Sequence, residues 1–217
     1  SEIKAEPSAA SSEDDGNGGN GNRRRRLVVF LLLMTVMAIN GLVYRAALTI
    51  FPLHLAERVS FPGLPDVVTG GVLASAVLAF GMVGMYTIGS AADRMDRFRL
   101  YAMLFAIVAP MLALMGVTYG VPLLISAVVF SLFYFPGQPV ENSILGTYVP
   151  PHLVSSIFGL KFVVTFGLGS LGSVGAGYVV ERMGSTTLYL GLAAATVVSF
   201  LVAYSASVVR RGERAAT

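Results

Sequence analysis

Three charged side chains lie inside long apolar stretches of the chain: Arg45, Glu141 and Lys161. Near the centre of a membrane helix each would cost roughly 2.5–3.5 kcal/mol, so a free charge facing lipid is disfavoured. An arginine suits the planar oxygens of a carboxylate, and a carboxylic acid can carry a proton. These residue types predict a site that binds an anionic solute and leaves room for coupling to protons.

Glu141 belongs to a polar stripe. Its members recur at i, i+4, i+7 and i+8 and so share one helical face: Tyr134, Gln138, Glu141 and Asn142. Pro136 and Pro139 interrupt the same segment and leave two carbonyl groups, those of Leu132 and Phe135, without their usual donors. A polar stripe beside a broken hydrogen-bond ladder favours a water-filled cavity. A structural polar network between helices is the alternative.

Arg45 lies in an earlier apolar segment and shares a helical face with Gly41. The neighbouring face carries Asn40 and Tyr44. We expect Asn40, Tyr44 and Arg45 to bind substrate together with the polar stripe. In the alternative arrangement Arg45 reaches outward, or pairs with Glu57 at the outer end of its span.

Lys161 is the expected partner of Glu141. At about 1.5 Å per residue, both lie in the inner third of the membrane, on consecutive helices. We predict an ion pair or a water-bridged pair, which would offset the cost of placing both charges in the membrane.

The elements that position these residues follow from the composition. Hydrophobic residues make up 55% of the 217 residues and charged residues only 12%, whereas soluble domains carry about 25% charged residues. Six apolar blocks are long enough to cross a bilayer as helices: 27–56, 68–91, 100–119, 121–148, 153–180 and 186–209. They are too long and too continuously apolar for barrel strands. The sequence therefore predicts an all-α membrane protein with six transmembrane helices.

Three regions follow one another along the chain. Residues 1–26 are expected to form a disordered cytoplasmic linker that ends in a basic anchor, RRRR at 23–26. Residues 27–209 form the six-helix transmembrane domain, and 210–217 a cytoplasmic tail. The four arginines are interpreted as a topology anchor rather than as a nucleic-acid site.

Lysines and arginines are distributed unequally between the two sides of this arrangement. The side that holds both termini carries Lys4, Arg23, Arg24, Arg25, Arg26, Arg94, Arg97, Arg99, Arg210, Arg211 and Arg214. The opposite side carries only Arg58 and Arg182. Because basic residues accumulate on the cytoplasmic side, we expect a multi-pass protein of the cell membrane with both termini of this chain in the cytoplasm.

A short motif occurs twice. Residues 89–95 read GSAADRM and residues 177–183 read GYVVERM. The first copy ends the second span and the second copy ends the fifth. This agreement predicts two inverted three-helix repeats, an arrangement that many transporters use.

The segment GSAADRMDRFR at 89–99 resembles the loop signature of the major facilitator superfamily, roughly G-x-x-x-D-R-x-G-R-x-R. The matching residues are Gly89, Asp93, Arg94, Arg97 and Arg99, while Asp96 replaces the usual second glycine. Residues 41–55 and 158–177 look like the seventh and eleventh helices of that superfamily. The resemblance covers residues 23–210 and implies the C-terminal six-helix half of a transporter, preceded by part of its central cytoplasmic loop.

The resemblance also implies roles for particular residues. The matching loop residues would form a conformational motif, with Asp93 acting across the boundary between the two halves. Two small-residue faces repeat at i, i+4 and i+8: Gly81, Met85 and Gly89, and Gly169, Ser173 and Gly177. The resemblance favours a sliding surface between halves at these faces, and tight helix packing within this half is the alternative.

Enzymatic functions find little support. The only histidines, His54 and His152, are expected on opposite sides of the membrane, and the chain has no cysteine. No P-loop is present, and no metal site, cofactor or catalytic residue is expected. The expected function is secondary active transport of a small solute by alternating access, as an antiporter or symporter. Its expected partners are the lipid bilayer and the N-terminal half of the transporter. The alternative is a stand-alone six-helix membrane scaffold or a homodimeric channel.

Overall fold

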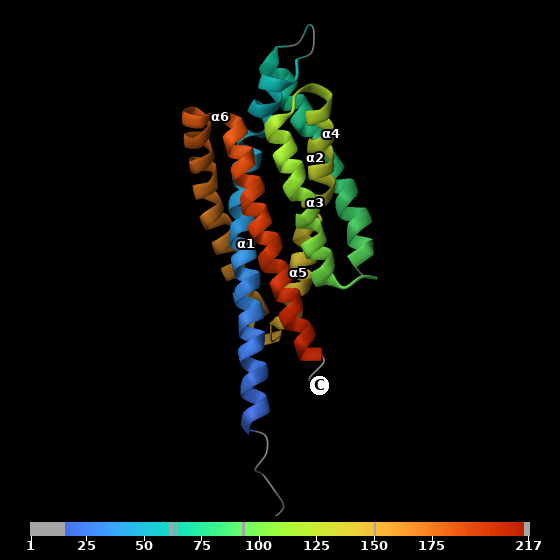
Figure 1. The fold of residues 1–217 in the computed structure, drawn as a ribbon, viewed down its shortest axis with the longest axis vertical. Coiled ribbons are helices and arrows are strands. Elements are labelled where there is room, and N and C mark those ends of the chain that lie inside the picture. The colour runs from blue at the N-terminus through green and yellow to red at the C-terminus, as the bar shows by residue number, and fades with distance from the viewer. Residues whose placement is uncertain (1–15, 61–62, 64, 93, 150, 215–217) are drawn as a thin grey trace, which may run out of the picture.

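The computed structural model describes residues 16–60, 63, 65–92, 94–149 and 151–214, without the side chains of 16–23, 26, 151 and 211–214. Every element in these ranges is helical (Figure 1). In chain order they are α1 (Gly16–Arg58), α2 (Asp66–Ala92), α3 (Arg97–Val117), α4 (Gly120–Tyr134), α5 (Gly137–Tyr148), the short 3-10 helix η1 (Pro151–Leu153) and α6 (Val154–Arg214).

Five helical segments in the described part are long and apolar enough to cross a membrane. They are Leu27–Arg58, Asp66–Ala92, Arg97–Val117, Gly120–Tyr148 and Val154–Arg210. The fourth consists of α4 and α5 together. The all-α class and the membrane-spanning character expected from the apolar blocks therefore agree with the fold.

The last segment is not one straight helix. Gly184 has φ 83° and ψ 163°, a non-helical conformation inside α6. A positive φ of this size favours glycine, which has no Cβ to clash. Figure 1 shows the two parts of α6 running in opposite directions. We call residues 154–183 the first arm of α6 and residues 185–214 its second arm.

A break separates α4 from α5 at Phe135 and Pro136. Proline has no N–H to continue the ladder, so a break here is expected. Pro139 leaves the Phe135 carbonyl without its usual donor, as predicted, and the Gln138 N–H donates to that carbonyl instead, at 3.2 Å. A tighter turn at the break thus supplies a substitute hydrogen bond.

Close helix contacts hold the bundle together at glycines. A Cβ on Gly84 of α2 would lie 2.1 Å from the carbonyl oxygen of Leu132 in α4. A Cβ on Gly172 would lie 2.6 Å from the Leu42 carbonyl oxygen, where the first arm of α6 meets α1. Only glycine lets two helix backbones approach this closely, a device that membrane bundles use in place of a hydrophobic driving force.

The two small-residue faces divide between packed and open positions. A Cβ on Gly81 would meet the Phe135 ring at 2.5 Å, and one on Gly169 would meet the Arg45 side chain at 2.9 Å. Gly89 and Gly177 have nothing within 4 Å of the same position. Tight packing within the bundle therefore explains part of each face, and the last glycine of each face has room for a Cβ.

The N-terminal region differs from the prediction in one respect. The composition of residues 1–26 predicts disorder, but α1 already begins at Gly16. Once the apolar part of α1 has formed, each further residue adds a hydrogen bond without a new nucleation cost, so the helix extends backward through the arginines. Residues 1–15 lie outside the described part.

Candidate functional site

Glu141 and Lys161 form an ion pair inside the bundle. The Lys161 Nζ lies 2.6 Å from the Glu141 Oε1, and each side chain is only 1% exposed. Glu141 comes from α5 and Lys161 from the first arm of α6. The close approach of these two residues is what their positions on consecutive apolar segments predict.

Two further groups complete this network. Tyr101 of α3 donates a 2.6 Å hydrogen bond from its hydroxyl to the Glu141 Oε2. Lys161 also donates to the Asn142 Oδ1, on the residue next to Glu141. Each carboxylate oxygen and the ammonium group thus faces a partner, which is what makes a buried pair of charges tolerable.

Tyr101 was not among the residues predicted for the site. It stands in an apolar run and reads as one more core aromatic side chain. Its partner lies forty positions away in the chain, so no local pattern links them. A buried tyrosine does need a partner for its hydroxyl, and that rule is the only signal that the sequence offers.

A second polar contact joins α1 to α4. The buried Tyr134 hydroxyl donates to the Asn40 Oδ1 at 2.6 Å, and the Tyr44 ring lies parallel to that of Tyr134 with centroids 6.0 Å apart. The structure thus brings together Asn40, Tyr44 and Tyr134, as predicted for one site. Gln138 is half-buried beside the α4–α5 break.

Arg45 lies apart from these buried contacts. Its side chain is exposed, and its guanidinium carbon lies 5.3 Å from the centroid of the Phe166 ring on the first arm of α6. No described residue forms an ion pair with it. The alternative pairing with Glu57 does not occur, because the Glu57 carboxylate accepts a 3.3 Å hydrogen bond from Ser185 instead. Arg45 and Glu141 share no hydrogen-bond or ion-pair partner among the described residues.

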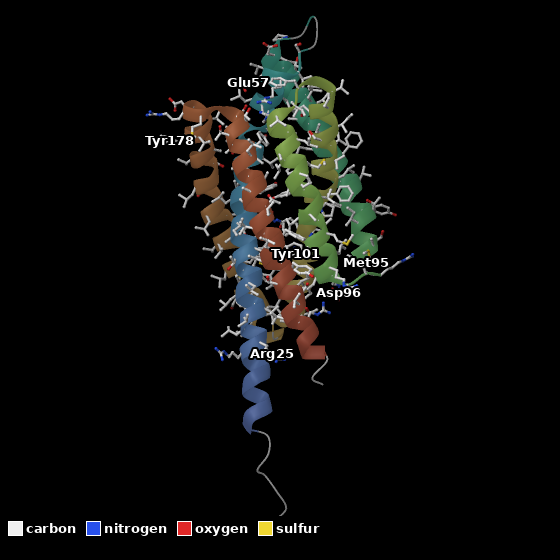
Figure 2. The ribbon with its side chains drawn as sticks, viewed as in Figure 1. Arg25, Glu57, Met95, Asp96, Tyr101 and Tyr178 are labelled. Atoms are coloured by element: carbon white, nitrogen blue, oxygen red, sulfur yellow. The ribbon has the colours of Figure 1, made fainter. Side chains whose placement is uncertain are left out.

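The loop motif lies at the end of the bundle that carries Arg25, away from the end that carries Glu57 (Figure 2). Gly89 is half-buried, Arg94 and Arg99 are exposed, and Arg97 is half-buried. Asp93 falls outside the described residues, so its proposed contact with another half stays a prediction.

Asp96 has a defined structural role that the sequence analysis missed. Its Oδ1 accepts the backbone N–H groups of Phe98 and Arg99, both at 3.1 Å, and so caps α3. Its Oδ2 lies 2.9 Å from the Arg210 Nη1 at the end of α6. Burial alone would raise its pKa, but the hydrogen bond from Arg99 and the charge of Arg210 outweigh burial and hold the pKa below the ordinary value of 3.8. An aspartate just before an apolar helix is a capping signal that the sequence does contain.

Arg58 ties three elements together at the opposite end. It donates to the Thr118 carbonyl at 3.0 Å and to the Thr186 hydroxyl at 2.5 Å. Its guanidinium carbon also lies 4.4 Å from the centroid of the Tyr119 ring. The end of α1 is thereby fixed to the α3–α4 turn and to α6 just beyond Gly184.

Within the described part of the chain, the Glu141 carboxylate is enclosed by other residues and does not face a water-filled cavity. Glu141 and Tyr134 are both buried. A groove of about 470 Å³ lies elsewhere, between α3 and the second arm of α6, and its walls are apolar: Phe105, Ala106, Ala109, Pro110, Ala113, Leu190, Ala193, Ala194, Val197 and Phe200. In this conformation the polar stripe forms a network between helices, which was the alternative interpretation.

Within the described residues no cluster of His, Asp or Glu side chains could hold a metal ion. Comparison with protein-family models and with curated proteins finds no match for this chain. The geometry of the charged and aromatic residues is therefore the basis for assigning a function to this chain.

Proposed function

We propose that this chain is the C-terminal half of a secondary transporter of the major facilitator type, which moves a small solute by alternating access. The proposal rests on the long apolar helices, on the loop motif at 89–99 and on charged residues placed deep in the bundle. An organic anion is the favoured solute, because Arg45 offers a cation to it. The N-terminal half would supply the other wall of the pathway.

The proposed half has six crossings, with each arm of α6 crossing once. A continuous helix of that length would extend roughly 90 Å at 1.5 Å per residue, about three times the hydrocarbon thickness of a bilayer. The turn at Gly184 supports two crossings instead. Two inverted three-helix repeats would then place α1 and the α4–α5 pair in equivalent positions.

The observation that carries the proposal is the ion pair between Glu141 and Lys161. Ionisable residues inside a membrane are expensive and usually mark pathways for ions, protons or solutes. The pair is built next to a broken helix, at α4–α5, and broken helices are where transporters place coupling sites. In the proposed cycle Glu141 exchanges its Lys161 partner for a proton when the bundle changes conformation.

A transport assay tests the proposal. The full-length protein is reconstituted into liposomes that contain a pH-sensitive dye, and a panel of small organic acids is added under an imposed pH gradient. We expect solute-dependent proton movement with the wild type. Glu141→Gln should abolish the proton movement but preserve exchange of solute for solute, because the neutral amide cannot release a proton.

Asp66→Asn serves as the matched control, since Asp66 is an exposed acid at the start of α2. It should leave the proton movement unchanged. A solute-independent current that Glu141→Gln does not alter would instead support a channel. Wild-type proton coupling in Glu141→Gln would remove the carboxylate from the mechanism.

A further inference from the structure

Arg45 is held in a fixed place without being neutralised. Its guanidinium carbon lies 5.3 Å from the Phe166 ring centroid, and its Cγ packs against Gly169, where a Cβ would approach to 2.9 Å. No acidic side chain among the described residues pairs with it, and its side chain is exposed. The N–H groups of the guanidinium therefore have room for an anion.

Arg45 lies far from both ends of the membrane-spanning part of α1. At about 1.5 Å per residue, Arg45 lies roughly 20 Å along α1 from Arg58 and roughly 30 Å from Arg25. Side chains that reach along lipid to the interface do so from positions near helix ends. An exposed arginine at this depth therefore faces either water or an anionic partner.

An aromatic surface adjoins the arginine. Phe162 and Phe166 follow one another on one face of the first arm of α6, with ring centroids 5.8 Å apart and planes within 11°. Both rings are about half exposed. One turn beyond Arg45, the Thr49 hydroxyl lies 2.9 Å from that of Ser173. The surface thus combines a cation, two parallel flat rings and a pair of hydroxyl groups.

We propose that Arg45, Phe162 and Phe166 form a subsite for an organic anion that carries a flat aromatic ring. The carboxylate would bind the free edge of the guanidinium through two parallel hydrogen bonds, and the ring would stack on the phenylalanine faces. This inference rests on the proposed function and names the class of solute. A lipid phosphate is disfavoured as the partner, because headgroups lie at the membrane surface and Arg45 does not.

Binding is measured directly, without transport, on the full-length protein in nanodiscs by isothermal titration calorimetry. Three probes separate the parts of the ligand: phenylacetate has both the charge and the flat ring, cyclohexylacetate has the charge and a puckered ring, and 2-phenylethanol has the ring alone. We expect phenylacetate to bind about three- to tenfold more tightly than cyclohexylacetate, and 2-phenylethanol to show no measurable binding.

Two variants test the residues. Arg45→Lys should weaken phenylacetate binding about tenfold, since lysine keeps the charge but loses the planar fork. Phe166→Leu should remove the preference for phenylacetate over cyclohexylacetate, whereas the loss of its contact with Arg45 should weaken both acids to the same extent. Phe80→Leu is the matched control, because Phe80 is an exposed phenylalanine of α2, and it should change neither affinity.

The outcomes distinguish this subsite from the proposed function. Phenylacetate binding that depends on Arg45 and Phe166 supports the subsite even where no uptake occurs, and the absence of uptake then counts against transport alone. Equal affinity for the two acids, or binding that Arg45→Lys leaves intact, overturns the subsite. Binding that is lost in phosphatidylglycerol nanodiscs but not in phosphatidylcholine nanodiscs would assign Arg45 to lipid and also overturn it.

Discussion

The Lys161 ammonium contacts two acceptors, on Glu141 and on Asn142, and both belong to α5. Tyr101 approaches the same carboxylate from α3. A single polar centre therefore joins three elements that apolar packing alone would leave free to slide. The sequence could predict that Glu141 and Lys161 lie at a similar depth and pair with each other, because a charge in an apolar run needs a partner. The identity of the tyrosine could not be predicted, since its contact depends on how α3 packs.

Removing the lysine alone should be far more harmful than removing both charges. Lys161→Met leaves the Glu141 carboxylate buried without its cation and should lower the free energy of unfolding by about 3–5 kcal/mol. The double variant Glu141→Gln/Lys161→Met leaves no unpaired charge and should recover most of that loss. Thermal unfolding of the detergent-solubilised variants measures both effects. A double variant as unstable as the sum of the single variants would contradict a direct pairing.

At the scale of the elements, the apolar blocks predicted most helices to within a few residues. The block 68–91 corresponds to α2 (Asp66–Ala92) and the block 121–148 to α4 with α5. The turn at Gly184 falls in the gap between the fifth and sixth blocks. These blocks can be recognised in the sequence because a helix that crosses a bilayer needs an apolar stretch as long as the hydrocarbon core is thick. Which faces pack together depends on individual glycines, whose role cannot be read from hydropathy.

The contact between α2 and α4 gives a test of glycine packing. Gly84→Ala places a methyl group 2.1 Å from the Leu132 carbonyl oxygen and should destabilise the protein by about 1–3 kcal/mol through overpacking. Gly175→Ala is the control, since nothing lies within 4 Å of its Cβ position, and it should be neutral or slightly stabilising. Thermal unfolding in detergent compares the two. Equal stability of both variants would show that α2 can move away from α4 at no cost.

The cap at the start of α3 gives a test with a pH dependence. Asp96→Asn keeps an oxygen for the cap and loses only the ion pair with Arg210, a loss of about 0.2–1 kcal/mol. Asp96→Ala loses the cap as well, which adds about 1 kcal/mol. Unfolding temperatures at neutral pH should therefore fall in the order wild type, Asn variant, Ala variant.

Acid should remove the advantage of the aspartate over asparagine. The pKa of Asp96 is lower in the folded protein than its ordinary 3.8, so the ionised form favours folding. That contribution is complete above about pH 5 and is lost as the pH falls through the folded pKa. The difference between wild type and Asp96→Asn should therefore shrink on acidification, whereas Arg210→Gln should match Asp96→Asn at neutral pH. A stability difference between wild type and Asp96→Asn that grows in acid would show that folding raises the pKa of Asp96 rather than lowering it.

At the scale of the whole molecule, segments far apart in the sequence meet at the same end of the bundle. Arg25 and Asp96 lie toward one end and Glu57 and Tyr178 toward the other (Figure 2). The order of the apolar spans could predict which segments share an end. The contact between Asp96 and Arg210, which are 114 positions apart, could not be predicted in that way.

Cysteine labelling tests the orientation and the fold-back of α6 together. Met95 and Met183 are both exposed methionines, and the native chain has no cysteine to give a background. With the expected orientation, Met95→Cys should react with a membrane-impermeant maleimide only after the cells are opened, and Met183→Cys in intact cells. Reaction of both in intact cells would reject the expected topology.

The pairing of Glu141 with Lys161 has a consequence for how the chain is made. The α5 segment leaves the ribosome before the first arm of α6, so Glu141 reaches the translocon before its partner does. Each charge alone costs about 2.5–3.5 kcal/mol to insert, and α5 is too short to cross a bilayer without α4. The α4–α5 segment and the first arm of α6 should therefore leave the translocon as a helical hairpin, with insertion and tertiary pairing completed in one step.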